Sequence, residues 1–314
     1  MGCIIGRGNM LGRSLTIGQF GLLGLTGLFL IVPHQVFAQQ AVPPASVVDL
    51  PIADLLQKYP EELQGVDLNG GGIELERLLN EISQGVDEFL RTLPNTVSKE
   101  HIRQEMLGSD GKVQDRVDQD VSYLLLLSFE DNRLDWEEAR TDSKGKTVAI
   151  RRLEGTSMLT SGYAMECILF SPRLLAGSRF RYLGRQVSEP HAYLIAFAQK
   201  PGQSAPGIFR MSGVQANLLS QGLAWVDPVN HQIIRMRSDM LEPLPQLGLV
   251  GHTTQITYAE HHFSSSPASF WLPEQVVVTI QFGSRTYRNT HRYSDYKLFS
   301  VESYEKREPI RPPQ

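Results

Sequence analysis

Histidine and glutamate side chains gather in the last third of the chain, where they could bind a metal ion or transfer protons. His252, Glu260 and His262 share one face of an extended strand, because side chains alternate with a period of two. His252 and Glu260 would lie roughly 26 Å apart at about 3.3 Å per residue, too far to bind one ion in a straight strand. Zinc requires three or four ligands, so His191 or His101 would have to complete the site. The pattern favours polar residues at a strand end, and a metal-dependent hydrolase is the third interpretation of the chain.

Other catalytic arrangements are also incomplete. Asp135 and Glu137 share a strand face beside Trp136, but a glycosidase also needs a sugar cleft and a defined carboxylate separation. The sequence lacks a Gly-x-Ser-x-Gly elbow, and the glycine run 70–72 is not followed by the Lys-Ser/Thr of a phosphate loop. We therefore predict a protein that is not an enzyme and that uses no cofactor and no metal.

Cys167 and a pair of arginines complete the set of reactive side chains. Cys167 has apolar neighbours and no basic residue or histidine close in sequence, which predicts a buried and unreactive thiol. Arg235 and Arg237 alternate with Ile234 and Met236. This alternation predicts an outward charged face, and the alternative is a rim that receives an anionic head group.

Residues 1–38 have the features of an export signal. Arg7 and Arg13 precede a mostly apolar run, and Val36 and Ala38 are small residues at the −3 and −1 positions of a cleavage site. The alternative is an uncleaved anchor, because the apolar run approaches the roughly 20 residues that span a bilayer. We expect a periplasmic or secreted protein, and after cleavage Cys167 has no partner for an internal disulfide. The formal charge of −4 argues against nucleic acid as a partner.

The rest of the chain changes from helical to β character near residue 94. In 73–93 apolar residues recur at helical spacing, which predicts an amphipathic helix. Further helices are expected over 51–64 and 156–176. A β-hairpin is expected around Asp227-Pro228-Val229-Asn230, since Pro and Asn suit a tight turn. Other strands are expected over 96–107, 121–129, 134–140, 179–186, 192–199, 207–211, 250–263, 274–282 and 293–304.

Many antiparallel strands without a βαβ alternation predict an α+β fold. Several strands carry apolar residues on both faces, which a large curved sheet (a half-barrel) with packing helices would explain. We divide the chain into a signal peptide (1–38), a linker with amphipathic helices (39–93), the half-barrel domain (94–306) and a disordered tail (307–314).

The order of these features resembles the LolA/LolB-like superfamily of periplasmic lipoprotein carriers and receptors, and uncharacterised exported bacterial proteins of the same layout. The resemblance implies a half-barrel whose concave face binds acyl chains. The residues that carry it are Gly222, Trp225, Val226, Asp227, Pro228, Ile234 and Arg235 in the hairpin, Trp271-Leu272-Pro273, and Tyr296-Lys297-Leu298-Phe299.

We therefore expect a lipid or another apolar ligand, or a lipidated protein, on the concave face. The alternative is a structural or protein-interaction module of the cell envelope, whose concave face is filled by its own helix 73–93 and which binds another envelope protein. An apolar core and an apolar pocket look the same in sequence. The expected ligand-binding residues are Trp225, Ile256, Tyr258, Phe270, Trp271, Phe282 and Arg235.

Overall fold

The computed structural model describes most of the chain after residue 44. The described residues are 2–5, 45–68, 73–93, 95–130, 133–148, 157–160, 163–203, 207–211, 214–264, 266 and 269–298. The predicted signal peptide, apart from residues 2–5, and the predicted tail lie outside them. Within this part of the chain, no helix combines the length and the apolar character needed to cross a membrane.

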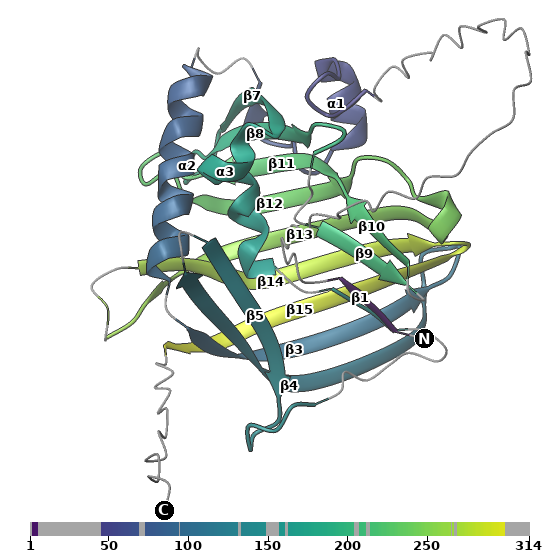
Figure 1. Ribbon diagram of the computed structural model, residues 1–314. Coiled ribbons are helices and arrows are strands. Elements are labelled where there is room, and N and C mark those ends of the chain that lie inside the picture. Colours follow the sequence, from purple (N-terminus) through teal and green to yellow (C-terminus); the bar gives the residue numbers. More distant parts are fainter. Residues whose placement is uncertain are drawn as a thin grey trace, which may run out of the picture.

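Eleven antiparallel strands form the main sheet, in the order β2-β7-β8-β11-β12-β13-β14-β15-β3-β4-β5 (Figure 1). Two small sheets accompany it: β1 (Gly2–Ile5) pairs in parallel with β6 (Ser157–Thr160), and β9 (Gly207–Met211) pairs with β10 (Val214–Leu218). The strands of the main sheet are β2 (Val66–Asp67), β3 (Thr96–Leu107), β4 (Val113–Glu130), β5 (Arg133–Thr141), β7 (Ser178–Gln186), β8 (Tyr193–Gln199), β11 (Ser220–Val226), β12 (Ile233–Met240), β13 (Leu249–His262), β14 (Ser269–Phe282) and β15 (Arg285–Leu298).

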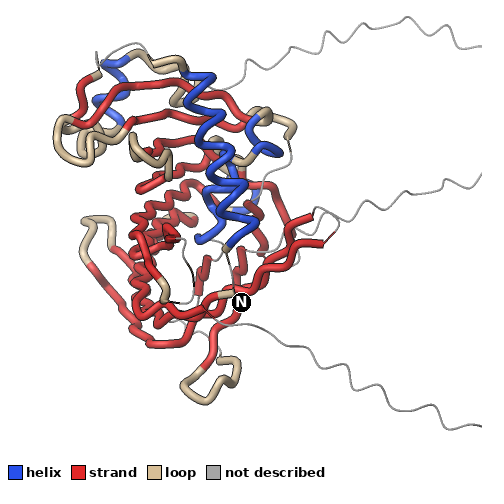
Figure 2. Tube along the Cα trace, turned by 90° about the vertical axis from the view of Figure 1, so that its left-hand side faces the viewer, coloured by secondary structure: helices blue, strands red, loops and turns tan. Residues whose placement is uncertain are grey.

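The main sheet is strongly curved, and the long helix lies inside its curve (Figure 2). Register shifts interrupt the pairing of β13 with β14 at Thr257/Tyr258 and of β15 with β3 at Ser294/Lys297. Such bulges increase local twist and bend a strand. The α+β fold with a half-barrel sheet and packing helices is confirmed.

The helices differ from the prediction in extent. The predicted helix 73–93 is present as α2 (Leu75–Thr92). Helix α1 (Ile52–Lys58) is shorter than predicted and ends before Tyr59, because a residue that precedes a proline is disfavoured in helical conformation.

The prediction of one helix over 156–176 is wrong. This segment contains strand β6, the 3₁₀ helix η1 (Tyr163–Phe170) and the short helix α3 (Pro172–Leu175). Pro172 lacks an amide hydrogen and cannot continue a helix, but it is well suited to begin one.

The hairpin of β11 and β12 is confirmed. The carboxylate of Asp227 accepts hydrogen bonds from the backbone amides of Val229 (2.8 Å) and Asn230 (3.0 Å), which closes the turn. Strands β1, β2 and β10 were not predicted. Strand β4 extends from Val113 instead of beginning at Val121, and β15 begins at Arg285 instead of Tyr293.

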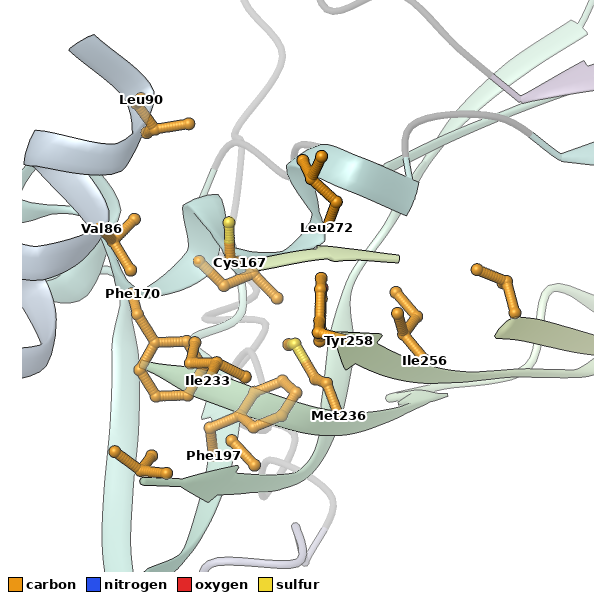
Figure 3. Packing of buried hydrophobic residues seen from close by; sticks show 14 of the residues in the cluster. Val86, Leu90, Cys167, Phe170, Phe197, Ile233, Met236, Ile256, Tyr258 and Leu272 are labelled. Carbon is orange, nitrogen blue, oxygen red and sulfur yellow. The ribbon is translucent and has the colours of Figure 1, made fainter. Parts of the chain in front are cut away.

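Two hydrophobic clusters lie on opposite faces of the sheet. The larger one fills the concave face beneath α2 and η1, and Figure 3 shows part of it. The smaller one lies on the convex face beneath α1 and includes Leu55, Tyr59, Leu194, Leu223 and Trp225. The alternation of side chains along β11 explains the division: Leu223 and Trp225 face one cluster, whereas Ala224 and Val226 face the other.

Gly222 is required where β11 and β12 approach each other, because a Cβ at this position would overlap the carbonyl oxygen of Arg237. We expect Gly222→Ala to lower the free energy of unfolding by about 1–3 kcal/mol, the cost typical of overpacking. Gly85→Ala within α2 is the control, since a Cβ there meets only the Gln232 side chain at 3.4 Å. That change should stabilise the protein by up to about 1 kcal/mol. Urea unfolding checks both, and equal stability of the two variants would contradict the close approach.

Candidate functional site

The concave face is covered by helix α2, and its apolar side chains make the contact. Leu78, Ile82, Val86 and Leu90 lie on one side of α2 and are buried in the concave cluster. The opposite side carries ion pairs within the helix, including Arg77 Nη1 to a Glu81 carboxylate oxygen at 2.7 Å. The amphipathic helix predicted from the sequence therefore covers the concave face with its apolar side and exposes its charged side.

The segment η1 and α3 forms the second part of this cover, and α2 packs against both. The Phe170 ring of η1 meets Phe197 of β8 edge to face, with ring centroids 5.6 Å apart. Burial raises the pKa of the Cys167 thiol to about 12, so the thiol stays protonated at neutral pH. Cys167 is thus a buried, unreactive core residue, as predicted from its apolar neighbours.

Five of the seven expected ligand-binding residues contribute to the concave cluster. Ile256, Tyr258 and Phe270 are buried in it, and Trp271 and Phe282 are half-buried and pack against it. Phe282 lies at the opposite end of β14 from Phe270, twelve residues away, so the five do not converge on one point. Their role in ligand binding stays a prediction.

The other two expected residues lie on the opposite face. Trp225 is buried in the convex cluster, and the Arg235 guanidinium stacks 4.4 Å from the centroid of its ring. Burial lowers the pKa of Arg235, although neighbouring Glu62 counteracts this. Arg237 on the same face forms an ion pair with Glu62 and lies 4.9 Å from the Tyr59 ring. The expectation that one surface unites all seven residues is therefore wrong, since strand alternation separates Trp225 and Arg235 from the rest.

A buried charged cluster in the concave wall was not anticipated. Two nitrogens of Arg140 on β5 donate to Glu100 on β3, at 2.7 and 2.9 Å. His291 Nδ1 lies 2.8 Å from the same carboxylate, and the Tyr293 hydroxyl donates to it at 3.1 Å. We call Glu100, Arg140, His291 and Tyr293 the charged cluster. Its members are distant in sequence, so only the order β15-β3-β4-β5 in the folded sheet could reveal it.

The charged cluster is stabilised by mutual neutralisation. Burial by itself would raise the pKa of Glu100, but Arg140 and His291 outweigh burial and hold this pKa at about 2. Burial lowers the pKa of His291, although Glu100 opposes the shift. A neutral His291 that donates from Nδ1 to an ionised Glu100 fits both shifts.

Aromatic rings continue from the charged cluster towards the turn between β13 and β14. Tyr293 lies 5.2 Å from Tyr123 and 6.4 Å from Tyr296, and Tyr296 lies 4.7 Å from the His261 ring. Offset and tilted rings at these separations add to the packing energy of their buried area. The concave wall therefore combines an apolar part under α2 with a more polar, aromatic part on β15, β3 and β4.

The side chains of the hydrolase interpretation do not converge. His252 is half-buried with its Nε2 atom enclosed, whereas Glu260 and His262 form an exposed pair 3.8 Å apart near the end of β13. His101 instead contacts Asp118 and Asp120 of β4. No group of three or more His, Cys, Asp or Glu side chains that could hold a metal ion exists among the residues the structure describes.

A groove of about 1030 Å³ is lined mostly by polar residues, together with Tyr293 of the concave cluster. Its lining includes a row of paired residues that crosses five strands, Thr257, Gln275, Arg292, His101 and Asp120. This row carries a hydroxyl, an amide, a guanidinium, an imidazole and a carboxylate, which is unlike an acyl-chain site.

Comparison with known proteins gives similarity to solved structures only. No family model matches the chain, and no curated protein sequence matches it. A domain described as an outer membrane lipoprotein-sorting protein domain, from Vibrio parahaemolyticus, is 10% identical, with 73% of this chain and 94% of that chain covered and a TM-score of 0.42. A DUF1329 family protein from Desulfovibrio piger is 8% identical, with 74% and 96% covered and a TM-score of 0.41. A LolA superfamily protein from Nitrosomonas europaea is 11% identical, with 71% and 94% covered and a TM-score of 0.38. The similarity to these structures concerns the fold alone.

Removal of Arg140 tests the charged cluster. Arg140→Met leaves Glu100 buried without its main counter-ion, and we expect a loss of about 3–5 kcal/mol in the free energy of unfolding at pH 7. The loss should shrink as the pH falls from 4.5 to 2, because the wild-type cluster itself loses its contribution when Glu100 is protonated. Arg77→Met, which breaks an exposed pair, should change stability by less than about 0.5 kcal/mol. Wild-type stability of Arg140→Met would contradict the role of the cluster.

The enclosed His252 predicts acid sensitivity. Burial lowers the pKa of His252 from 6.5 to about 4, so below pH 6.5 the unfolded chain binds a proton that the folded chain rejects. Stability attributable to this group is present above pH 6.5 and decreases, by on the order of 3 kcal/mol, as the pH falls to 4. We expect His252→Leu to flatten the dependence of urea unfolding on pH across this interval. His262→Gln, at an exposed position, should keep the wild-type slope; equal slopes for all three proteins would refute the assignment.

Proposed function

We propose that this protein binds an apolar ligand, such as a lipid or the acyl chains of a lipidated protein, between the concave face of its sheet and helix α2. The observation that carries the proposal is the continuous apolar surface of the concave face, which includes Ile256, Met236 and Leu272 and which α2 and η1 cover. A sheet needs to bury this surface, and either the chain's own helix or an apolar ligand can do so.

Helix α2 is suited to act as a movable cover. Its inner contacts are non-directional apolar contacts, which another apolar surface can replace at small cost. A polar contact joins α2 to the sheet: a carboxylate oxygen of Glu81 lies 3.2 Å from Nε2 of His231, in the turn between β11 and β12. Both side chains are partly exposed. Displacement of α2 by acyl chains therefore exchanges one apolar contact for another.

The export signal predicted from residues 1–38 supports a periplasmic or extracellular site of action. Acyl chains are poorly soluble in water, so lipids and lipidated proteins need a protein that covers these chains when they cross an aqueous compartment. A carrier with an apolar concave face can do this. Under this proposal the protein is a carrier and not an enzyme.

The second candidate is a structural or interaction module in which α2 fills the concave face permanently. The burial of Leu78 and Ile82, at 1% and 0% exposed, favours it. The two candidates differ in one property, the release of α2 from the sheet.

A reversible link between α2 and the sheet separates the candidates. The Nε2 atom of Gln232 lies 3.4 Å from a Cβ placed on Gly85, so cysteines at these two positions are within reach of a short bis-methanethiosulfonate cross-linker, whose bond to each thiol is a reducible disulfide. We expect the reduced double variant (Gly85→Cys with Gln232→Cys) to take up the apolar fluorophore diphenylhexatriene, and the cross-linked one to lose most of this uptake. The prediction rests on α2 blocking access to the concave face.

Each single cysteine variant, treated with the same cross-linker, is the control and should keep its uptake. Uptake by the cross-linked double variant would refute displacement of α2 as the route of entry. No uptake by the wild-type or the reduced protein would overturn the carrier function and leave the structural module.

A further inference from the structure

The hydroxyl of Tyr258 is an unsatisfied polar atom inside the apolar concave cluster. The Tyr258 side chain is 6% exposed, and its oxygen has no hydrogen-bond partner in the part of the chain that the structure describes. Figure 3 shows Tyr258 among Ile256, Met236 and Cys167, in the layer between the sheet and η1. A buried hydroxyl without a partner is costly, so such groups in native proteins call for a specific explanation.

Two further polar groups face the same layer. The Ser238 side chain is 4% exposed, shares a strand face with Met236, and faces the Glu166 carboxyl of η1 without closing a hydrogen bond of good geometry. Glu166 also interacts electrostatically with the Tyr258 hydroxyl. Ser238 is paired with Thr254, four residues from Tyr258 along β13, so these groups are spread over roughly 13 Å of the layer beneath the cover. We call Tyr258, Ser238 and Glu166 the polar triplet.

The polar triplet is unsuited to a charged group. Burial raises the pKa of both Tyr258 and Glu166, which favours their neutral forms. The arginines of β12, Arg235 and Arg237, contact Trp225 and Glu62 on the convex side and cannot neutralise an anion at this point. A hydroxyl can donate to a carbonyl oxygen, and a serine or a carboxyl group can accept from a hydroxyl or an amide.

We propose that Tyr258 of the polar triplet binds the uncharged polar group of an acyl ligand, namely an ester or an amide, by donating a hydrogen bond to its carbonyl oxygen. This inference rests on the proposed function, since it places the acyl chains of the same ligand in the apolar cluster around Ile256. It adds a preference for neutral acyl esters or amides over free fatty acids and other anionic lipids.

Tyr258→Phe tests the inference, because it removes one oxygen atom and no contact of the ligand-free protein. We expect unchanged or slightly higher thermal stability, since an unsatisfied buried group is lost. Affinity for monoolein, an uncharged acyl ester, should fall about 5- to 10-fold, the worth of one hydrogen bond. Affinity for diphenylhexatriene, a pure hydrocarbon, should stay unchanged, and wild-type protein should bind monoolein more tightly than oleate.

Tyr293→Phe is the matched control on the same face. The Tyr293 hydroxyl already donates to Glu100, so its loss should lower stability and leave the ratio of monoolein to diphenylhexatriene affinity unchanged. If wild-type protein binds diphenylhexatriene, but wild type and Tyr258→Phe bind monoolein with equal affinity, the inference about Tyr258 is wrong and the proposed function stands. Tighter binding of oleate than of monoolein would overturn it too. Failure of wild-type protein to bind any of the three probes would overturn the proposed function as well.

Discussion

The burial of one apolar surface, the concave side of the eleven-stranded sheet, is the constraint that the rest of the structure satisfies. The sheet exposes this surface along β8 and β11–β14, and water would make it unfavourable. Helix α2 and the segment η1–α3 cover it with Leu78, Ile82 and Phe170. The covering elements come from before and within the strand series, so the chain closes over its own sheet. The apolar contacts that stabilise the fold are thus the ones that a ligand would replace.

The convex face has a different role. Helix α1 packs there on Leu223 and Trp225, and Arg235 and Arg237 fold over Trp225 and Tyr59 instead of projecting from the surface. Stacked guanidinium groups combine the burial of their stems with favourable contact to aromatic faces. Apolar packing of α1 and the stacked, ion-paired arginines therefore cover the convex face. These contacts attach the N-terminal segment to the domain.

The concave side is not uniformly apolar. The charged cluster places a bidentate Glu100–Arg140 pair in the wall, where strong geometry and mutual neutralisation compensate for the loss of water. The Tyr258 hydroxyl, in contrast, has no hydrogen-bond partner among the residues that the structure describes. The groups of the charged cluster hydrogen-bond one another, whereas the Tyr258 hydroxyl can still donate a hydrogen bond to a ligand. Burial alone therefore does not distinguish a structural polar group from one that could bind a ligand. The distinction depends on hydrogen-bond partners, which only the folded chain supplies.

The sequence by itself determined the class of fold, the amphipathic helix of α2 and the hairpin at Asp227, because these depend on local periodicity and turn chemistry. It did not reveal the polar strand 113–120, which has no apolar run, or the break at Pro172 in a segment with helical spacing. The tertiary structure decided which face each residue joined: Tyr258 and Trp225 look alike in sequence, yet strand register places them on opposite sides of the sheet. It also brought Glu100, Arg140 and His291 together, because contacts between strands far apart in the chain follow from sheet order and not from local pattern.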